Sequence, residues 1–221
     1  MHVLLFGATG MIGQGVLHAC LADPGVTTVT AIGRTPTGRA HAKLREIVTP
    51  DVTALRPHEG ALADVDACFF CLGVSSAGMT EARYAALTFD LTLAVARTLA
   101  SLRPAMTFVY VSGVGTDATE RGRTMWARVK GRTEHALLAL FPAAYMFRPG
   151  FVQALPGTTS RTPLYRVLYA VGRPIFPLLR RLFPTQVLSA DQIGRAMLSV
   201  ARHGHERRVL EPPDIVAAAA R

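Results

Sequence analysis

Residues 3 to 13 read VLLFGATGMIG, and they are the most informative part of the sequence about its fold. The run His2 to Phe6 is short and apolar, as buried strands are. Three glycines follow with the spacing GxxGxxG, and Met11 to Leu21 then repeats apolar residues at helical spacing. A strand that enters a helix through such a glycine turn is typical of dinucleotide-binding proteins.

The chemistry of a diphosphate explains the glycines in this turn. A residue without Cβ permits the tight turn, a second lets the diphosphate approach the backbone, and a third allows the helix and the strand to pack closely. The start of the helix offers free N–H groups and the positive end of its dipole. We therefore expect the whole loop to bind a cofactor: Gly7, Ala8, Thr9, Gly10, Met11, Ile12 and Gly13.

Beyond this turn, apolar strands alternate with amphipathic helices along the chain. We expect strands at 2–6, 26–32, 44–48, 66–72, 107–111, 144–147 and 208–210, and helices at 11–21, 80–102, 126–140 and 190–201. This alternation implies βαβ units with right-handed crossovers. The predicted fold class is α/β, a Rossmann-like doubly wound parallel sheet, in one domain over residues 1–221.

The composition changes after Pro149. Within the segment 153–188, residues 156–184 are rich in proline, arginine and large apolar groups, and Pro174, Pro177 and Pro184 exclude one long helix. We expect a small C-terminal helical cap that covers the edge of the sheet and helps to form the substrate pocket. Arg180 and Arg181 among apolar residues leave two alternatives open, a dimer face and a membrane-surface patch.

The end of the second expected strand indicates which dinucleotide binds. NAD-binding chains place an Asp or Glu there, where it accepts hydrogen bonds from the ribose hydroxyls. This chain reads Ala31-Ile32-Gly33-Arg34 instead. A guanidinium pairs with a 2′-phosphate, and Thr35, Thr37 and Arg39 stand close by in the sequence. The pattern favours NADP(H) over NAD(H), unless Arg34 is only a solvated loop residue.

Several segments together resemble the short-chain dehydrogenase/reductase superfamily, in its atypical, epimerase/dehydratase-like branch. They are Gly7 to Gly13, Arg34, Tyr110-Val111-Ser112-Gly113 and Val129-Lys130-Gly131, and the resemblance as a whole covers roughly residues 1 to 152. The resemblance implies that Ser112 hydrogen-bonds the substrate oxygen and that Lys130 binds the nicotinamide ribose. It also implies cofactor contacts from two later segments: Leu72 and Gly73, and Pro149, Gly150, Phe151 and Val152.

This sequence differs from that family at Trp126, one helical turn before Lys130. Only two of the 24 lysine and arginine residues are lysines, and Lys130 is one of them. The family places a tyrosine four residues earlier as acid and base, but this chain has Trp126. An indole N–H donates a hydrogen bond and does not titrate usefully. Trp126 therefore either stacks on the nicotinamide or fills the space, and Tyr84 is one of the tyrosines left to face the site.

Composition excludes several other classes of function. The formal net charge is +9, but the arginines are scattered and no basic stripe with aromatic residues appears, so we expect no nucleic acid partner. The three cysteines fit small core residues better than a disulfide or redox pair. His203 and His205 lack further ligands nearby in the sequence, so we expect no metal.

Three functional hypotheses remain from the sequence. The first is an NADP(H)-dependent oxidoreductase or epimerase-like enzyme acting on a small carbonyl or hydroxyl substrate, as a monomer or homodimer. The second is a non-catalytic NADP(H)-binding sensor or interaction module, and the third is a membrane-surface adaptor. The N-terminus has no secretory pattern and no run of 18 apolar residues occurs, so we expect a cytoplasmic protein without a spanning helix.

Overall fold

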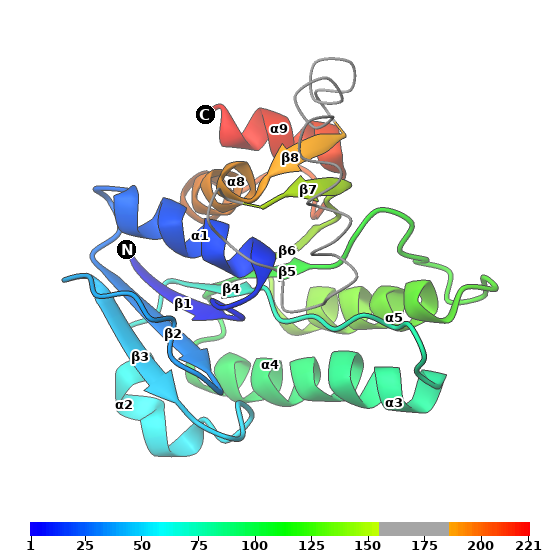
Figure 1. Cartoon of the computed structure of the whole chain (residues 1–221), viewed down its shortest axis with the longest axis horizontal. Helices are drawn as coiled ribbons and strands as arrows, with labels where there is room; N and C mark the ends of the chain where they lie inside the picture. Colours follow the sequence, from blue (N-terminus) through cyan, green and yellow to red (C-terminus); the bar gives the residue numbers. More distant parts are fainter. Residues whose placement is uncertain (155–185) are drawn as a thin grey trace.

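The computed structural model describes residues 1–154 and 186–221. Its centre is a seven-stranded sheet in the order β3-β2-β1-β4-β5-β6-β9, and every neighbouring pair is parallel (Figure 1). The strands are β1 (His2–Phe6), β2 (Thr28–Gly33), β3 (Leu44–Val48), β4 (Ala67–Phe70), β5 (Thr107–Val111), β6 (Ala144–Phe147) and β9 (Val209–Leu210). The strand order reverses direction beside β1, which confirms the doubly wound Rossmann-like prediction.

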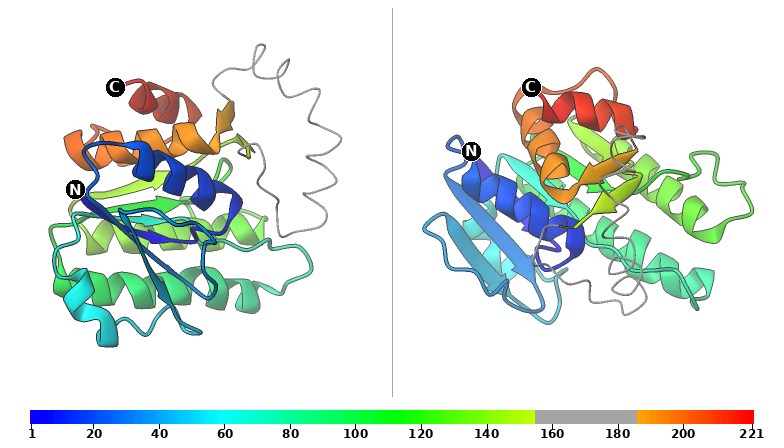
Figure 2. Two further views of the ribbon diagram at one scale, coloured as in Figure 1. Left: turned by 60° about the vertical axis from the view of Figure 1, so that its left-hand side comes forward. Right: turned by 45° about the horizontal axis from the view of Figure 1, so that its top comes forward.

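Helices cover both faces of this sheet (Figures 1 and 2). One face carries α1 (Met11–Ala22), α8 (Ala190–His203) and α9 (Pro212–Ala219). The other carries α2 (Glu59–Leu62), α4 (Leu91–Leu102) and α5 (Met125–Leu140). Because side chains alternate between the faces of a strand, Val3 and Leu5 join the core under α1, while Leu4 and Phe6 join the core over α4. The sheet is thus buried on both faces, as parallel sheets require.

The two cores also explain the pair of cysteines near β4. Cys68 is fully buried in the core over α4, whereas Cys71 packs against the core under α1. All three cysteines are free thiols, and Cys20 is also buried. Burial raises the pKa of each thiol well above its usual value. The expectation that these residues are core hydrophobes is confirmed.

The long helix expected from Thr80 runs from Glu81 to Leu102 and has an irregular middle. It consists of α3 (Glu81–Ala85), a π-helical turn at Ala86–Asp90 and α4. By length and composition alone this helix could cross a membrane, contrary to the sequence expectation. Core helices of soluble proteins share this length and composition, and here Val95 and Leu99 pack into the sheet core.

Other differences from the sequence prediction lie near the C-terminal part of the chain. A second, two-stranded parallel sheet joins β7 (Phe151–Gln153) to β8 (Val187–Ser189), and α9 follows β9; neither was predicted. Short segments of this kind carry too few residues for a periodic pattern. The expected helical cap falls mainly on residues 155–185, which lie outside the described residues.

Candidate functional site

The glycine loop between β1 and α1 has the geometry that its sequence predicted. Gly7 adopts a φ of 80°, and a Cβ there would lie 2.7 Å from the carbonyl carbon of Cys71. A Cβ on Gly13 would lie 2.0 Å from the carbonyl oxygen of Gly7. The loop is closed by the Gly10 N–H, which donates to Gly7 O at 2.9 Å. Both positions therefore require glycine, and α1 begins directly above the turn, at Met11.

A cavity of about 230 Å³ opens beside this loop at the carboxyl ends of β1, β2, β3 and β4. It brings together six predicted cofactor residues: Gly7, Ala8, Thr9, Arg34, Leu72 and Gly73. Thr35 and Thr37 also line it. The crevice lies where the strand order reverses, which is where open α/β sheets bind their ligands.

Sequence reasoning missed another wall of this cavity. That wall comes from β3 and the loop after it, and it includes Glu46, Val48 and Asp51. Leu87, within the π-helical turn, and Leu91, directly after that turn, line it from the long helix. Asp51 accepts hydrogen bonds from the backbone and hydroxyl of Thr53, which keep its pKa below the usual value. The wall thus combines apolar surface with carboxylates that accept hydrogen bonds.

A second group of predicted residues lies where β5 and β6 end beside α5. Ser112 directly follows β5 and is buried, while Trp126 and Lys130 lie one turn apart on α5 and are half-buried. The Lys130 ammonium donates to the backbone carbonyl of Ser112. This contact brings Ser112 and Lys130 together, while the substrate and ribose contacts that the resemblance implies for them stay predictions.

Ser112 also contacts a buried carboxylate that sequence reasoning missed. Its hydroxyl donates to Glu134 Oε1 at 2.5 Å and lies 3.2 Å from Phe147 O. Glu134 is one turn beyond Lys130 on α5, and its side chain is only 2% exposed. The spacing Trp126, Lys130, Glu134, four residues each, was the available sequence signal.

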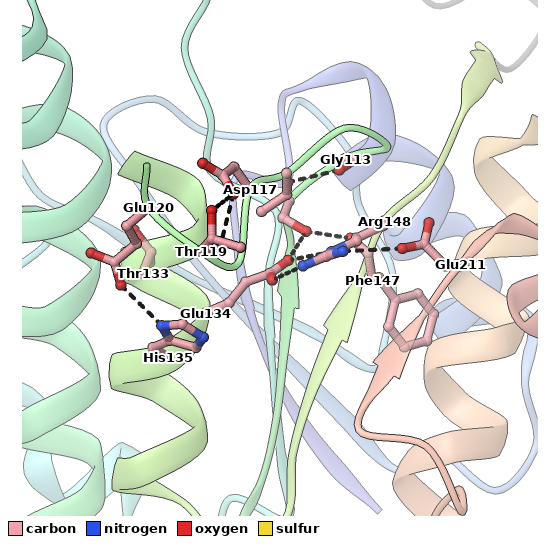
Figure 3. Close-up of polar contacts among 12 residues, drawn as sticks. Gly113, Asp117, Thr119, Glu120, Thr133, Glu134, His135, Phe147, Arg148 and Glu211 are labelled. Carbon is pink, nitrogen blue, oxygen red and sulfur yellow. Dashed lines mark hydrogen bonds and ion pairs between the residues drawn. The ribbon is translucent and has the colours of Figure 1, made fainter. Parts of the chain in front are cut away.

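Arg148 compensates the buried charge of Glu134. Its Nε donates to Glu134 Oε1 at 3.0 Å and its Nη2 to Oε2 at 2.5 Å, a bidentate pair. Its Nη1 reaches Glu211 at 3.1 Å (Figure 3). The hydrogen bonds that Arg148 donates to Glu134 raise the pKa of its guanidinium above the usual value. The hydroxyl of Ser112 is therefore held by a network that joins β5, α5, β6 and the start of α9.

Burial changes the acid–base behaviour of Lys130. Loss of solvent around its ammonium lowers its pKa to about 8, while the charge of Glu134 acts in the opposite direction. A lysine in this range titrates close to neutral pH, unlike one exposed to water. Lys130 can therefore donate or accept a proton under physiological conditions.

The remaining predicted residues, Trp126, Pro149 to Val152 and Tyr84, do not line the cavity beside the glycine loop. The ring of Trp126 lies against Gly115, where a Cβ would be 3.4 Å from its Cη2. Among Pro149 to Val152, the Pro149 carbonyl accepts from the Val114 N–H at 3.2 Å, while the Phe151 side chain is 74% exposed. Tyr84 is buried, and its burial raises the pKa of its phenol. The cofactor and catalytic roles of these residues stay predictions.

Metal ligands do not gather in the part of the chain that the structure describes, where no three His, Cys, Asp or Glu residues form a group suited to an ion. His205 instead hydrogen-bonds through Nδ1 to the backbone of Arg207.

Comparison with known proteins identifies the family of this fold. The model of the NAD dependent epimerase/dehydratase family matches residues 3–128. A relative from Emericella nidulans, named "Protein fmp52, mitochondrial", is 33% identical over 159 residues. That match covers 68% of this chain and 66%, just under two thirds, of the relative.

Solved structures share the fold at lower identity. A short-chain dehydrogenase/reductase family oxidoreductase from Burkholderia thailandensis is 17% identical, with a TM-score of 0.66 over 98% of this chain and 92% of that one. MoeE5 in complex with UDP-glucuronic acid and NAD is 18% identical, with a TM-score of 0.69 over 100% of this chain and 81% of that one. These matches confirm the predicted fold, and the family model over residues 3–128 confirms the epimerase/dehydratase-like resemblance.

The same comparison contradicts one expectation. Several related fungal proteins carry names that describe them as mitochondrial. These names contradict the prediction of a cytoplasmic protein, which is therefore wrong. It rested on the lack of a secretory pattern, which excludes only one destination.

Proposed function

The chain belongs to the NAD-dependent epimerase/dehydratase family, and we propose that it is an NADP(H)-dependent oxidoreductase or epimerase-like enzyme acting on a small carbonyl or hydroxyl substrate. One observation carries this proposal: the cavity at the β1–β4 edge joins the glycine loop to Arg34, and Ser112 and Lys130 meet at the ends of the next strands of the same sheet. The family description supports a nicotinamide dinucleotide, and the preference for NADP(H) is our inference.

Arg34 supports the choice of NADP(H). It is exposed at the end of β2 and lines the cavity, where its guanidinium would pair with a 2′-phosphate. The end of β2 has no Asp or Glu that could accept hydrogen bonds from the ribose hydroxyls of NAD(H). The N–H groups at the start of α1 would hold the diphosphate.

Ser112, Lys130 and Trp126 define the proposed reaction centre. When bound, the nicotinamide supplies or accepts a hydride. The Lys130 ammonium lies beside Ser112 and would stabilise negative charge on the substrate oxygen, and its pKa of about 8 suits proton exchange. The Ser112 hydroxyl already donates to Glu134, so it offers lone pairs to a substrate hydroxyl.

A second candidate function is a non-catalytic NADP(H)-binding sensor or interaction module. Trp126 favours it, because an indole cannot replace the phenol of the family as a proton donor. In that case the same cavity and loop bind the dinucleotide, and no substrate is turned over.

Tryptophan fluorescence provides the first test, since Trp126 is the only tryptophan. We expect NADPH to reduce the fluorescence of Trp126 strongly, by quenching or by energy transfer to the nicotinamide. NADH should reduce it more weakly. Arg34→Gln should remove most of that difference. NADPH oxidation with a panel of small aldehydes and ketones then separates the two candidates. Absence of binding to either dinucleotide, checked by calorimetry, would contradict both.

A further inference from the structure

The cavity that Arg34 lines is also lined by a carboxylate, that of Glu46. Glu46 lies on β3, the edge strand, paired in register with Ala31 of β2. It lines the same cavity as Arg34 and Thr37. Side chains alternate along a strand, so Ile47 packs against the core over α4 while Glu46 does not belong to it. The edge strand β3 thus supplies the cavity with a carboxylate, Glu46, whereas the end of β2 supplies none.

A short hydrogen bond fixes the position of this carboxylate. The Thr37 backbone N–H donates to Glu46 Oε1 at 2.6 Å, and the Arg39 N–H donates to the Thr37 hydroxyl at 3.3 Å. Gly38 adopts a φ of 71° and turns the loop back. The loop that begins at Arg34 is therefore tied to β3 through Glu46, and the charge of Glu46 stays beside it.

We propose that Glu46 is a specificity-determining residue, whose charge opposes the 2′-phosphate that Arg34 attracts and so moderates the preference for NADPH. This inference rests on the proposed NADP(H) function. A 2′-phosphate carries negative charge and is repelled by a nearby carboxylate, whereas the hydroxyls of NADH can donate to it. Glu46 therefore disfavours NADPH without disfavouring NADH, and the pair Arg34 and Glu46 sets the ratio of the two affinities.

Calorimetry with NADPH and NADH on the full chain tests this proposal without a known substrate. Glu46→Gln keeps an oxygen that accepts from Thr37 and removes the charge. We expect its Kd for NADPH to fall by about three- to tenfold at low salt, with little change for NADH. The gain should shrink at high salt because the groups are exposed.

Two further variants separate charge from other effects. Glu206→Gln makes the same change of charge next to β9, at the opposite edge of the sheet, and should leave both Kd values unchanged. Glu46→Ala removes the charge and the acceptor together. Its NADPH affinity should therefore be weaker than that of Glu46→Gln, because the loop is no longer held.

The outcomes distinguish this inference from the function on which it rests. If Arg34→Gln abolishes the NADPH preference but Glu46→Gln leaves the ratio unchanged, or lowers it, only the role of Glu46 is overturned. If Glu206→Gln raises NADPH affinity equally, the effect is one of net charge and Glu46 has no special role. If the wild type binds neither dinucleotide, both proposals fall.

Discussion

Glu134 Oε1, on α5, accepts a hydrogen bond of 2.5 Å from the hydroxyl of Ser112, at the end of β5. The same carboxylate forms a bidentate pair with Arg148, so its buried charge is compensated. Ser112 has one hydroxyl proton, and this contact directs it away from a substrate. In the proposed reaction centre the serine would therefore act as a hydrogen-bond acceptor, and Lys130 is the neighbouring group that carries protons to donate.

Removing Arg148 should destabilise the protein strongly. Arg148→Met leaves Glu134 buried without its partner, which typically costs about 3–5 kcal/mol of unfolding free energy. Urea unfolding followed by circular dichroism measures this loss. Arg195→Met is the matched control, because Arg195 is 54% exposed and pairs with Asp191 at the surface. It should cost less than about 1 kcal/mol; equal losses would contradict the buried network.

Lys130 should titrate far below the ordinary range of a lysine. With only two lysines in the chain, ¹³C NMR of labelled lysine resolves both, and Lys130→Arg assigns the signal. We expect a pKa of about 8, lowered by burial. A value near 10.4, typical of a lysine in water, would contradict the burial of the ammonium.

The same shift predicts how stability depends on pH. Between about pH 8 and the ordinary lysine pKa, the unfolded chain binds a proton at Lys130 that the folded chain has released. Because the unfolded state then holds more protons, the contribution of Lys130 to the unfolding free energy rises with pH through this window. Lys130→Met should flatten that rise in urea titrations between pH 8 and 10, and an unchanged slope would argue against it.

Gly13→Ala should disrupt the dinucleotide loop. Its Cβ would lie 2.0 Å from the Gly7 carbonyl oxygen, so α1 or the loop must move. We expect NADPH binding to weaken at least about tenfold, because the N–H groups at the start of α1 shift. Gly60→Ala meets nothing within 4 Å and is the control; its binding should match wild type in calorimetry. Equal binding by both variants would remove the loop from the site.

Trp126→Tyr should raise activity if the chain is an enzyme. A phenol at this position, one turn before Lys130, supplies the proton donor that the indole lacks, and such donors typically accelerate reactions about 10²-fold or more. Trp126→Phe changes the size of the ring without adding a titratable group. NADPH oxidation with the most reactive carbonyl of the panel compares them, and equal rates would show that another residue handles the proton.

The sequence alone predicted the sheet and the dinucleotide loop correctly. The bounds of β1, β3, β5 and β6 were predicted exactly as they occur, because each strand is a local apolar run with clear breaks on either side. The glycine loop could also be predicted from local sequence, because its strand, turn and helix follow one another directly in the chain. Ser112 and Lys130 were proposed as site residues from short motifs next to such elements, and their roles stay predictions.

Only the tertiary structure revealed how the residues of the site are held. Glu134 meets Arg148 and Ser112 because α5, β5 and β6 pack together, and Arg148 meets Glu211 only after β9 joins the sheet. Glu46 reaches Thr37 because the register of β3 on β2 places it there. Periodic patterns record which face of an element is buried. They do not record which distant partner a polar side chain meets, since that depends on the register and packing of the whole sheet.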